Sequence, residues 1–172
     1  MKGLGLSLFP GLDFFGRGFE AHGWTVVKGP DLMLGQDVRT FEGIPGKFDG
    51  VIGGPPCQAF SRANQNVTEL ALATGNEMLQ QFARIVRECN PEWWLMENVP
   101  SVPNVTIPGF SHQRLDLNAL ECGSVQNRLR HFQFGARVGS TVIRPQRIEL
   151  VTTQREAVND RSPLENCDPT AS

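Results

Sequence analysis

Residues 76–98 read NEMLQQFARIVRECNPEWWLMEN, an amphipathic helix followed by an apolar strand. Apolar side chains recur every three or four residues over positions 76–89, with polar side chains between them, which is typical of a helix with one buried face. An Asn-Pro pair then ends the helix. The apolar run at 93–96 is typical of a strand buried on both faces of a parallel sheet. The stretch therefore predicts one helix–strand unit of an α/β fold.

Three shorter strand-like segments precede this unit, and each ends at a turn rich in glycine or proline: residues 3–9, 24–27 and 48–52. Asp13 is expected to cap a helix that runs to His22. After the unit, the alternating segment 130–134 predicts a strand, and residues 115–120 predict either a short strand or a turn of helix. Strands that alternate with helices favour a doubly wound, mostly parallel sheet.

The composition is that of one globular domain. The chain has 172 residues, of which 40% are hydrophobic and 20% are charged. We expect a single domain over residues 1–153 and a polar, loosely ordered tail over residues 154–172. The formal net charge of −2 argues against nucleic-acid binding by bulk charge alone, but it is compatible with a local basic face.

The four cysteines lie far apart and include no CxxC pair, which indicates neither a disulfide framework nor a zinc site. No apolar run approaches the ~18 residues of a membrane span, and no signal-peptide pattern opens the chain. These features predict a cytoplasmic protein without a metal site. In a reducing compartment, one cysteine in an unusual setting is a candidate nucleophile.

Such a setting occurs in residues 53–61, Gly-Gly-Pro-Pro-Cys-Gln-Ala-Phe-Ser. An apolar strand is expected to deliver the chain to the carboxyl edge of a sheet, where open α/β folds bind ligands. Two glycines and two prolines then force a tight loop around Cys57. On composition alone, we give about half of the weight to a structural turn that contains a thiol without a function, and the rest to a functional cysteine. So much rigid backbone around one thiol favours a functional cysteine.

Charged residues lie in or next to two other strand-like segments. Glu97 comes directly after the apolar run at 93–96 and is expected at the same edge as Cys57. A lone glutamate there is usually a solvated cap, but beside Cys57 it could protonate a ring nitrogen of a substrate. Arg128 and Arg130 alternate along a strand-like stretch, so both would point to one face. This face is either a charged edge strand or a cationic site for phosphate or carboxylate.

The first strand-like segment ends in the turn Leu8-Phe9-Pro10-Gly11-Leu12, where backbone amides could approach a ligand. Asp31 and Asp37 follow the second segment. They could accept hydrogen bonds from a ribose and an adenine, respectively, or they are plain turn aspartates.

Taken in order, these motifs resemble the cytosine-5 DNA methyltransferase family: a Phe-x-Gly turn, then Pro-Pro-Cys-Gln-Ala-Phe-Ser, then Glu-Asn-Val, then Gln-x-Arg-x-Arg. The resemblance covers about residues 2–135, and the compact chain looks like the small methylases of phages and prophages. It implies a Rossmann-like fold that uses S-adenosylmethionine and acts on DNA, in restriction-modification or in protection of phage DNA. The family usually continues with a target-recognition region and a closing motif rich in glycine and asparagine. Neither is found after residue 135, so we expect this fold to be truncated at its C-terminus.

The resemblance also implies roles for individual residues. Cys57 would add to carbon 6 of a flipped-out cytosine, while Glu97 protonates ring nitrogen 3 and carbon 5 takes the methyl group. Arg128 would orient the base, supported by Arg130. The resemblance assigns the cofactor pocket to Phe9, Pro10, Gly11, Leu12, Asp31, Asp37, Val38 and Pro56, and substrate binding to Gln58, Ser61, Asn98 and Gln126. The first motif departs from the family at two places, because Ser7 replaces a usual acidic residue and Asp13-Phe14 replaces a usual glycine pair.

Three hypotheses follow. The chain is an active minimal DNA methyltransferase, or a catalytic half that needs a partner chain for target recognition, or a non-catalytic remnant that binds DNA or cofactor. Six intact motif residues argue against a remnant: Cys57, Gln58, Glu97, Asn98, Arg128 and Arg130. Methylation of a free nucleotide is a minor alternative, and steep salt dependence of DNA binding would argue against it.

Overall fold

The computed structural model describes residues 2–56 and 68–137. The strands are β1 (Leu4–Leu8), β2 (Thr25–Lys28), β3 (Gly50–Gly53), β4 (Trp93–Asn98), β5 (Ser111–Asn118) and β6 (Leu129–Ala136). The α-helices are α1 (Phe14–Glu20) and α2 (Glu69–Cys89), and short 3-10 turns are η1 (Leu32–Leu34), η2 (Val38–Thr40) and η3 (Ala119–Glu121). The predicted site residues Cys57, Gln58 and Ser61 lie outside the described residues, as does the expected tail over 154–172.

One sheet joins the described strands in the order β2-β1-β3-β4-β6-β5. The first four strands in this order are parallel, while β6 is antiparallel to both β4 and β5. The predicted mostly parallel sheet is therefore confirmed, with an antiparallel hairpin at one edge. The strand order reverses between β1 and β3, which is the topological switch point where open α/β sheets bind ligands.

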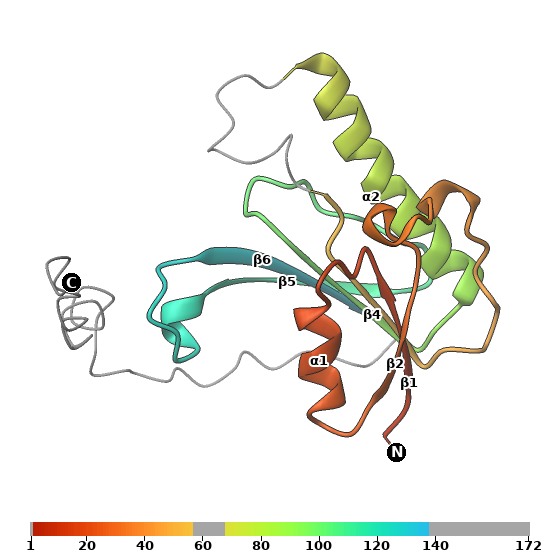
Figure 1. Ribbon diagram of the computed structural model, residues 1–172, viewed down its shortest axis with the longest axis horizontal. Coiled ribbons are helices and arrows are strands. Elements are labelled where there is room, and N and C mark those ends of the chain that lie inside the picture. The colour runs from red at the N-terminus through yellow and green to blue at the C-terminus, as the bar shows by residue number, and fades with distance from the viewer. Residues whose placement is uncertain (1, 57–67, 138–172) are drawn as a thin grey trace, which may run out of the picture.

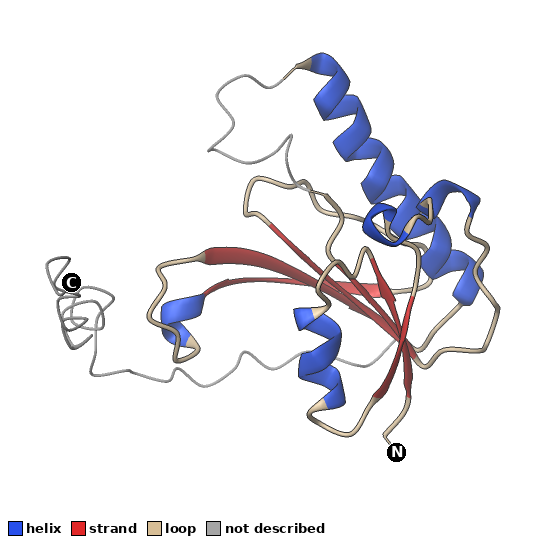
Figure 2. Cartoon of the chain, viewed as in Figure 1, coloured by secondary structure: helices blue, strands red, loops and turns tan. Residues whose placement is uncertain are grey.

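The two α-helices lie on opposite faces of this sheet (Figure 1). Phe19 of α1 stacks on Trp93 with 5.5 Å between ring centroids, whereas Phe82 of α2 meets Trp94 edge-on at 5.9 Å. Neighbouring residues on a strand point to opposite faces, so these two contacts place α1 and α2 on either side of β4. Figure 2 shows the same layering of helix, sheet and helix, and the predicted doubly wound arrangement is confirmed.

Two elements differ from the sequence expectations in a physically informative way. Burial along β4 alternates, with Trp94, Met96 and Asn98 buried and the residues between them half-buried, because the short α1 covers its face incompletely. Helix α2 begins seven residues earlier than predicted, where the Thr68 hydroxyl accepts a hydrogen bond from the Ala71 N–H at 3.2 Å.

Across residues 2–56 and 68–137, no helix combines the length and the apolar character that crossing a bilayer requires.

The buried face of α2 forms the main core with β1, β3 and β4. Helix residues such as Phe82, Ile85 and Val86 are fully buried there. Cys89 belongs to this core, and burial raises the pKa of its thiol to about 11. A thiol that holds its proton so firmly is a packing group and not a nucleophile.

His131 of β6 is a fully buried histidine. Burial lowers the pKa of its imidazole, and the positive charge of Arg114 acts in the same direction. The Asp116 carboxylate and the Val102 backbone oppose this shift without cancelling it. The folded protein therefore keeps His131 neutral at a pH where an unfolded histidine takes up a proton.

This burial predicts that the protein loses stability in mild acid. Below the unfolded-state pKa of ~6.5, the unfolded chain binds one proton more than the folded chain, so the free energy of unfolding falls by up to about 1.4 kcal/mol per pH unit. Above that pH this contribution is constant. Urea unfolding between pH 5 and 8 tests this, with His131→Gln as the non-titrating comparison. Equal pH slopes for the two proteins would contradict the account.

Candidate active site

A cleft of about 410 Å³ opens at the carboxyl edge of the sheet, around the switch point between β1 and β3. The end of β1 and the following turn form one wall, and the ends of β3 and β4 with the start of β6 form the other. The lining residues are Ser7, Leu8, Phe9, Pro10, Leu12, Asp13, Phe14, Phe15, Gly53, Gly54, Glu97, Arg128 and Phe132. A cleft of this size accommodates a small molecule, since ligand pockets are usually about 300–1,000 Å³.

The turn between β1 and α1 has an unusual backbone. Phe9, Gly11 and Asp13 all have left-handed conformations, with φ of 54°, 52° and 56°. For a residue such as phenylalanine this conformation costs about 1–2 kcal/mol, and such strain is common at ligand sites. The Gly11 N–H donates to Asp31 Oδ2 at 2.9 Å, and the Met33 N–H donates to Asp31 Oδ1 at 2.7 Å. Asp31 therefore ties this turn to the end of β2.

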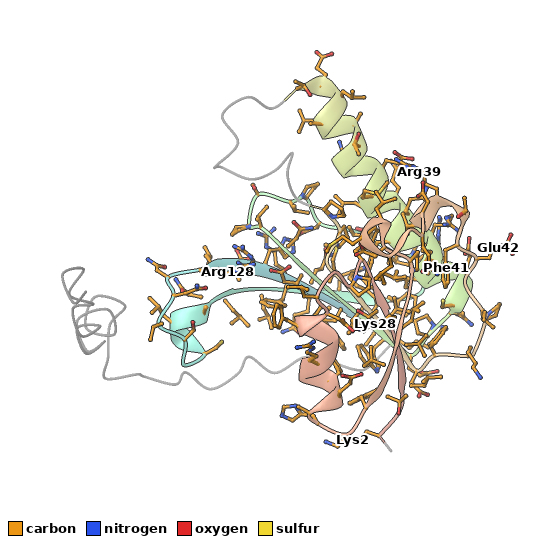
Figure 3. The ribbon with its side chains drawn as sticks, viewed as in Figure 1. Lys2, Lys28, Arg39, Phe41, Glu42 and Arg128 are labelled. Carbon is orange, nitrogen blue, oxygen red and sulfur yellow. The ribbon has the colours of Figure 1, made fainter. Side chains whose placement is uncertain are left out.

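The opposite wall carries the charged residues of the later motifs. Glu97 Oε1 forms an ion pair with Arg130 Nε at 2.9 Å, and both side chains are partly buried. Arg128 lines the cleft just ahead of β6, and Figure 3 shows it on the β5–β6 hairpin. Its backbone N–H donates to Asn118 Oδ1 at 3.2 Å, which fixes the hairpin end. Glu97, in its ion pair with Arg130, and Arg128 thus line the same cleft.

Asn98 is 2% exposed and holds the chain that leads to Cys57. Its Nδ2 donates to the Pro55 carbonyl oxygen at 2.9 Å, and its Oδ1 accepts from the Val99 N–H at 2.9 Å. Both polar atoms of the Asn98 carboxamide therefore form hydrogen bonds within the core. The geometry favours a positioning role for Asn98 over direct substrate contact.

Replacing Asn98 with aspartate is expected to lower the free energy of unfolding by about 1–3 kcal/mol, because the Pro55 carbonyl loses its donor and faces a carboxylate. Chemical denaturation measures this change. Asn76→Asp, at an exposed position of α2, is the matched control and should change stability by at most about 0.5 kcal/mol. Equal losses in both variants would exclude the proposed anchor.

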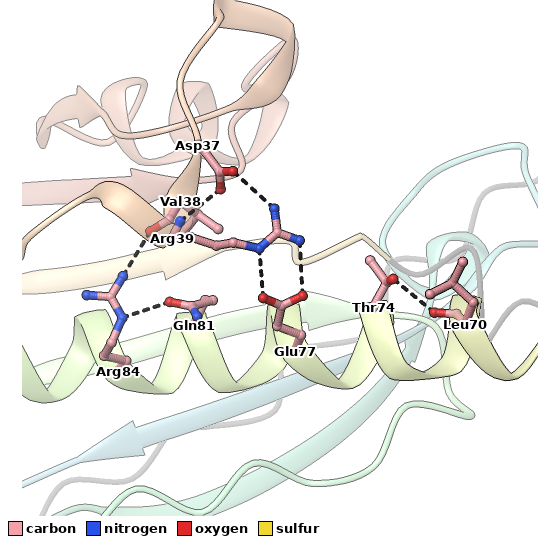
Figure 4. A network of polar contacts seen from close by, with 8 residues as sticks. All are labelled: Asp37, Val38, Arg39, Leu70, Thr74, Glu77, Gln81 and Arg84. Atoms are coloured by element: carbon pink, nitrogen blue, oxygen red, sulfur yellow. Dashed lines mark hydrogen bonds and ion pairs between the residues drawn. The ribbon is translucent and has the colours of Figure 1, made fainter.

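A second polar network joins the Asp37–Val38 segment to α2 (Figure 4). Arg39 pairs with Asp37 at 3.0 Å and with Glu77 of α2 at 2.7 Å. The Arg39 backbone N–H, together with its guanidinium, holds the pKa of Asp37 below its ordinary value. Arg84 of α2 donates to the Val38 carbonyl oxygen at 2.9 Å. Asp37 is thereby kept ionised, as a hydrogen-bond acceptor should be.

Comparisons with known proteins agree with this geometry. The chain matches the family model of the C-5 cytosine-specific DNA methylases over residues 33–106. It is 26% identical to the type II methyltransferase M.XorII of Xanthomonas oryzae pv. oryzae over 79% of its own length, and 28% identical to M.AgeI of Thalassovita gelatinovora over 82%. The predicted resemblance to the cytosine-5 DNA methyltransferase family is thereby confirmed.

Solved structures support the fold of this chain. A DNA modification methyltransferase encoded within an E. coli prophage superposes with a TM-score of 0.68 at 20% identity, over 90% of this chain and 54% of that one. A DNMT2 variant of Spodoptera frugiperda gives 0.53 at 19% identity, over 87% and 56% of the two chains. The chain spans 41% of the length of M.XorII and the same share of M.AgeI.

The structure brings several predicted site residues together on the cleft wall: Phe9, Pro10, Leu12, Glu97 and Arg128. Others reach that wall through a direct contact, since Arg130 binds Glu97 and Asp31 binds the Gly11 N–H. Within the described residues, the lining of this cleft does not include Asp37, Val38, Pro56 or Gln126.

Asp13 and Phe132 are among the lining residues that the sequence interpretation did not assign to the site. It took Asp13 only as a helix cap, but the side chain is also buried at the cleft. It also passed over Phe132, which the alternation of Arg128 and Arg130 along the chain would have placed on the same face.

Proposed function

We propose that this protein transfers a methyl group from S-adenosylmethionine to carbon 5 of cytosine in DNA. The observation that carries the proposal is the shared cleft of the β1–α1 turn, Glu97 and Arg128. Four separate chain segments converge there, at the edge where α/β folds bind ligands. The match to the C-5 cytosine-specific DNA methylase model over residues 33–106 independently favours the same chemistry.

The residues present fit the proposed methyl donor. Apolar side chains of Phe9, Pro10 and Leu12 offer one wall. The Asp31 carboxylate, which accepts the Gly11 N–H, is the proposed acceptor for ribose hydroxyls. Asp37, which lies outside the lining of the described cleft and is held by Arg39, is the proposed acceptor for an adenine amino group. Both Asp31 oxygens already accept a backbone N–H, but each carboxylate oxygen has a further acceptor site. When bound, S-adenosylmethionine supplies the electrophilic methyl group.

The proposed reaction begins at Cys57, whose thiolate adds to carbon 6 of cytosine. Glu97 protonates ring nitrogen 3, which neutralises the charge that this addition creates and makes carbon 5 nucleophilic. After methyl transfer, a base takes the proton from carbon 5, the bond between Cys57 and carbon 6 breaks, and ring nitrogen 3 returns its proton to Glu97, which restores the aromatic ring. Arg130, whose Nε lies 2.9 Å from Glu97 Oε1, holds the Glu97 side chain in position.

DNA is the proposed partner, and the cytosine has to leave the base stack to reach a cleft of this kind. Base flipping costs a few kcal/mol. Arg128 is exposed at the mouth of the cleft and is proposed to orient the base or its phosphate. Such contacts compensate for the mildly acidic net charge of the chain. We place this activity in the cytoplasm of a bacterium or of a phage-infected cell.

A second chain that supplies target recognition is the alternative form of this proposal. In that case the described cleft performs the same chemistry, and DNA specificity resides in the partner.

Methyl transfer to DNA of mixed sequence tests the proposal directly. Labelled S-adenosylmethionine is supplied, and 5-methylcytosine is identified in the digested DNA by mass spectrometry. We expect label in 5-methylcytosine with wild-type protein and none with Cys57→Ala. Label in free deoxycytidine nucleotides but not in DNA would favour the minor alternative. Binding of the methyl donor without any transfer, alone or with a candidate second chain, would overturn the proposal.

A further inference from the structure

Asp13 presents a buried carboxylate oxygen that has no donor among the described residues. The residue is 2% exposed and lines the cleft. Its Oδ1 accepts two hydrogen bonds, from the Ser7 hydroxyl at 2.9 Å and from the Gly16 N–H at 3.0 Å. Its Oδ2 is buried and accepts none from the described residues. A buried carboxylate oxygen is unfavourable unless a donor reaches it, so this atom calls for a donor from beyond the described residues.

The position of this oxygen is fixed by the surrounding backbone. Asp13 has a left-handed backbone with φ of 56°, and its N–H donates to the Pro10 carbonyl oxygen at 2.6 Å. The two bonds to Oδ1 hold the side chain from the other direction. Gly16 packs directly against the carboxylate, because a side chain there would lie 2.5 Å from Oδ2. The unsatisfied oxygen is therefore a built feature of the cleft wall.

The charges around the cleft indicate which kind of donor suits this oxygen. The negative charge of Glu97 is already matched by Arg130 at 2.9 Å. No such ion pair involves Asp13 within residues 2–56 and 68–137. A cationic N–H donor gives a carboxylate a shorter and stronger hydrogen bond than a neutral donor does.

We propose that Asp13 binds the α-ammonium group of the methyl donor through Oδ2. The inference rests on the proposed function, because S-adenosylmethionine carries a primary ammonium at its amino-acid end. It adds a ligand contact from the β1–α1 turn and explains why a carboxylate is buried on the cleft wall. The product S-adenosylhomocysteine keeps the same ammonium group, so it reports on this contact without any reaction.

Calorimetric titration with two ligands tests the contact. The first ligand is S-adenosylhomocysteine, and the second is its analogue in which hydrogen replaces the α-amino group. Wild-type protein is expected to bind the analogue about 10- to 100-fold more weakly, as for a lost hydrogen bond between charged groups. Asp13→Asn is expected to reduce this ratio to about threefold or less, since it removes the charge. Asparagine still caps a helix and tolerates the left-handed backbone, so the turn is preserved.

Two further variants make the result decisive. Asp49→Asn, which weakens a carboxylate–backbone hydrogen bond at the far end of β1, should keep the wild-type ratio. Serine also caps helices, so Asp13→Ser replaces Asp13→Asn in the titration if the asparagine variant does not fold. An Asp13 variant that keeps the wild-type ratio, or wild-type protein that binds both ligands equally, overturns the inference and leaves the proposed function standing. Wild-type protein that binds neither ligand contradicts both.

Discussion

Replacing Glu97 with glutamine is expected to lower the rate of methyl transfer by a factor of about 10²–10⁴, the usual contribution of a positioned general acid. Glutamine has nearly the same shape and still accepts a hydrogen bond from Arg130, which contacts Glu97 at 2.9 Å. It has no acidic proton for the cytosine ring. The loss should therefore lie in the turnover rate at saturating DNA and methyl donor, while the binding of both ligands changes little.

The control for this prediction is the same substitution at Glu92, at the opposite end of β4 from Glu97. Glu92 lies just before the strand, is 72% exposed, and approaches Arg137 at 3.8 Å. Glu92→Gln also removes one carboxylate from an ion pair, but far from the cleft. It should keep the wild-type rate within about twofold, since exposed ion pairs contribute little. A Glu97→Gln protein that is as active as Glu92→Gln would exclude Glu97 as the proton donor.

Replacing Phe82 with alanine is expected to lower the free energy of unfolding by about 3–5 kcal/mol. The ring is fully buried, packs edge-on against Trp94 at 5.9 Å, and lies under the end of β3. A side chain at Gly53 would come within 3.0 Å of it, so the ring supports the strand that delivers the chain to the cleft. The substitution leaves a large cavity between α2 and the sheet, which the surrounding residues fill only in part.

Urea unfolding followed by circular dichroism measures this loss. Leu70→Ala is the matched control because it lies on the same helix and is 77% exposed. We expect it to change stability by at most about 0.5 kcal/mol. If both substitutions had similar effects, the packing of α2 on the sheet described above would be wrong.

The periodicity of residues 76–98 was sufficient to predict the central helix–strand unit, because one buried helix face imposes a regular spacing of apolar side chains. The start of α2 was not predictable in the same way. Its first turns, from Glu69, are mostly exposed, so no apolar pattern marks them. The β5–β6 hairpin was only partly predicted, since the half-buried β5 carries a weak alternation.

The sequence was sufficient to predict the motifs of the site, but not the contacts between their side chains. Glu97 and Arg130 are 33 residues apart in the chain, and their ion pair follows from the β4–β6 pairing, in which Glu97 faces Phe132. That pairing is a long-range property that local patterns do not encode. The hydrogen bond between Ser7 and Asp13 was hidden for a different reason, because these residues are six apart and meet through a turn with left-handed backbone at Phe9 and Gly11. Each residue departs from the usual family motif, but only the fold brings the two departures into contact.

Covalent trapping tests the central claim most directly. Purified protein is mixed with S-adenosylmethionine and DNA that carries 5-fluorocytosine in many sequence contexts, and the products are separated on a denaturing gel. Fluorine on carbon 5 cannot leave as a proton does, so an enzyme that has added Cys57 to carbon 6 and transferred the methyl group stays bound to the DNA. Cys122→Ala, which removes an exposed free thiol, is the control for unspecific attachment.

We predict a protein–DNA complex that survives denaturation, forms only with the methyl donor present, persists in Cys122→Ala and disappears in Cys57→Ala. Sequencing of the trapped DNA would then identify the target. A wild-type protein that binds S-adenosylmethionine and DNA but gives no complex would contradict the account, and so would a complex that survives the loss of Cys57.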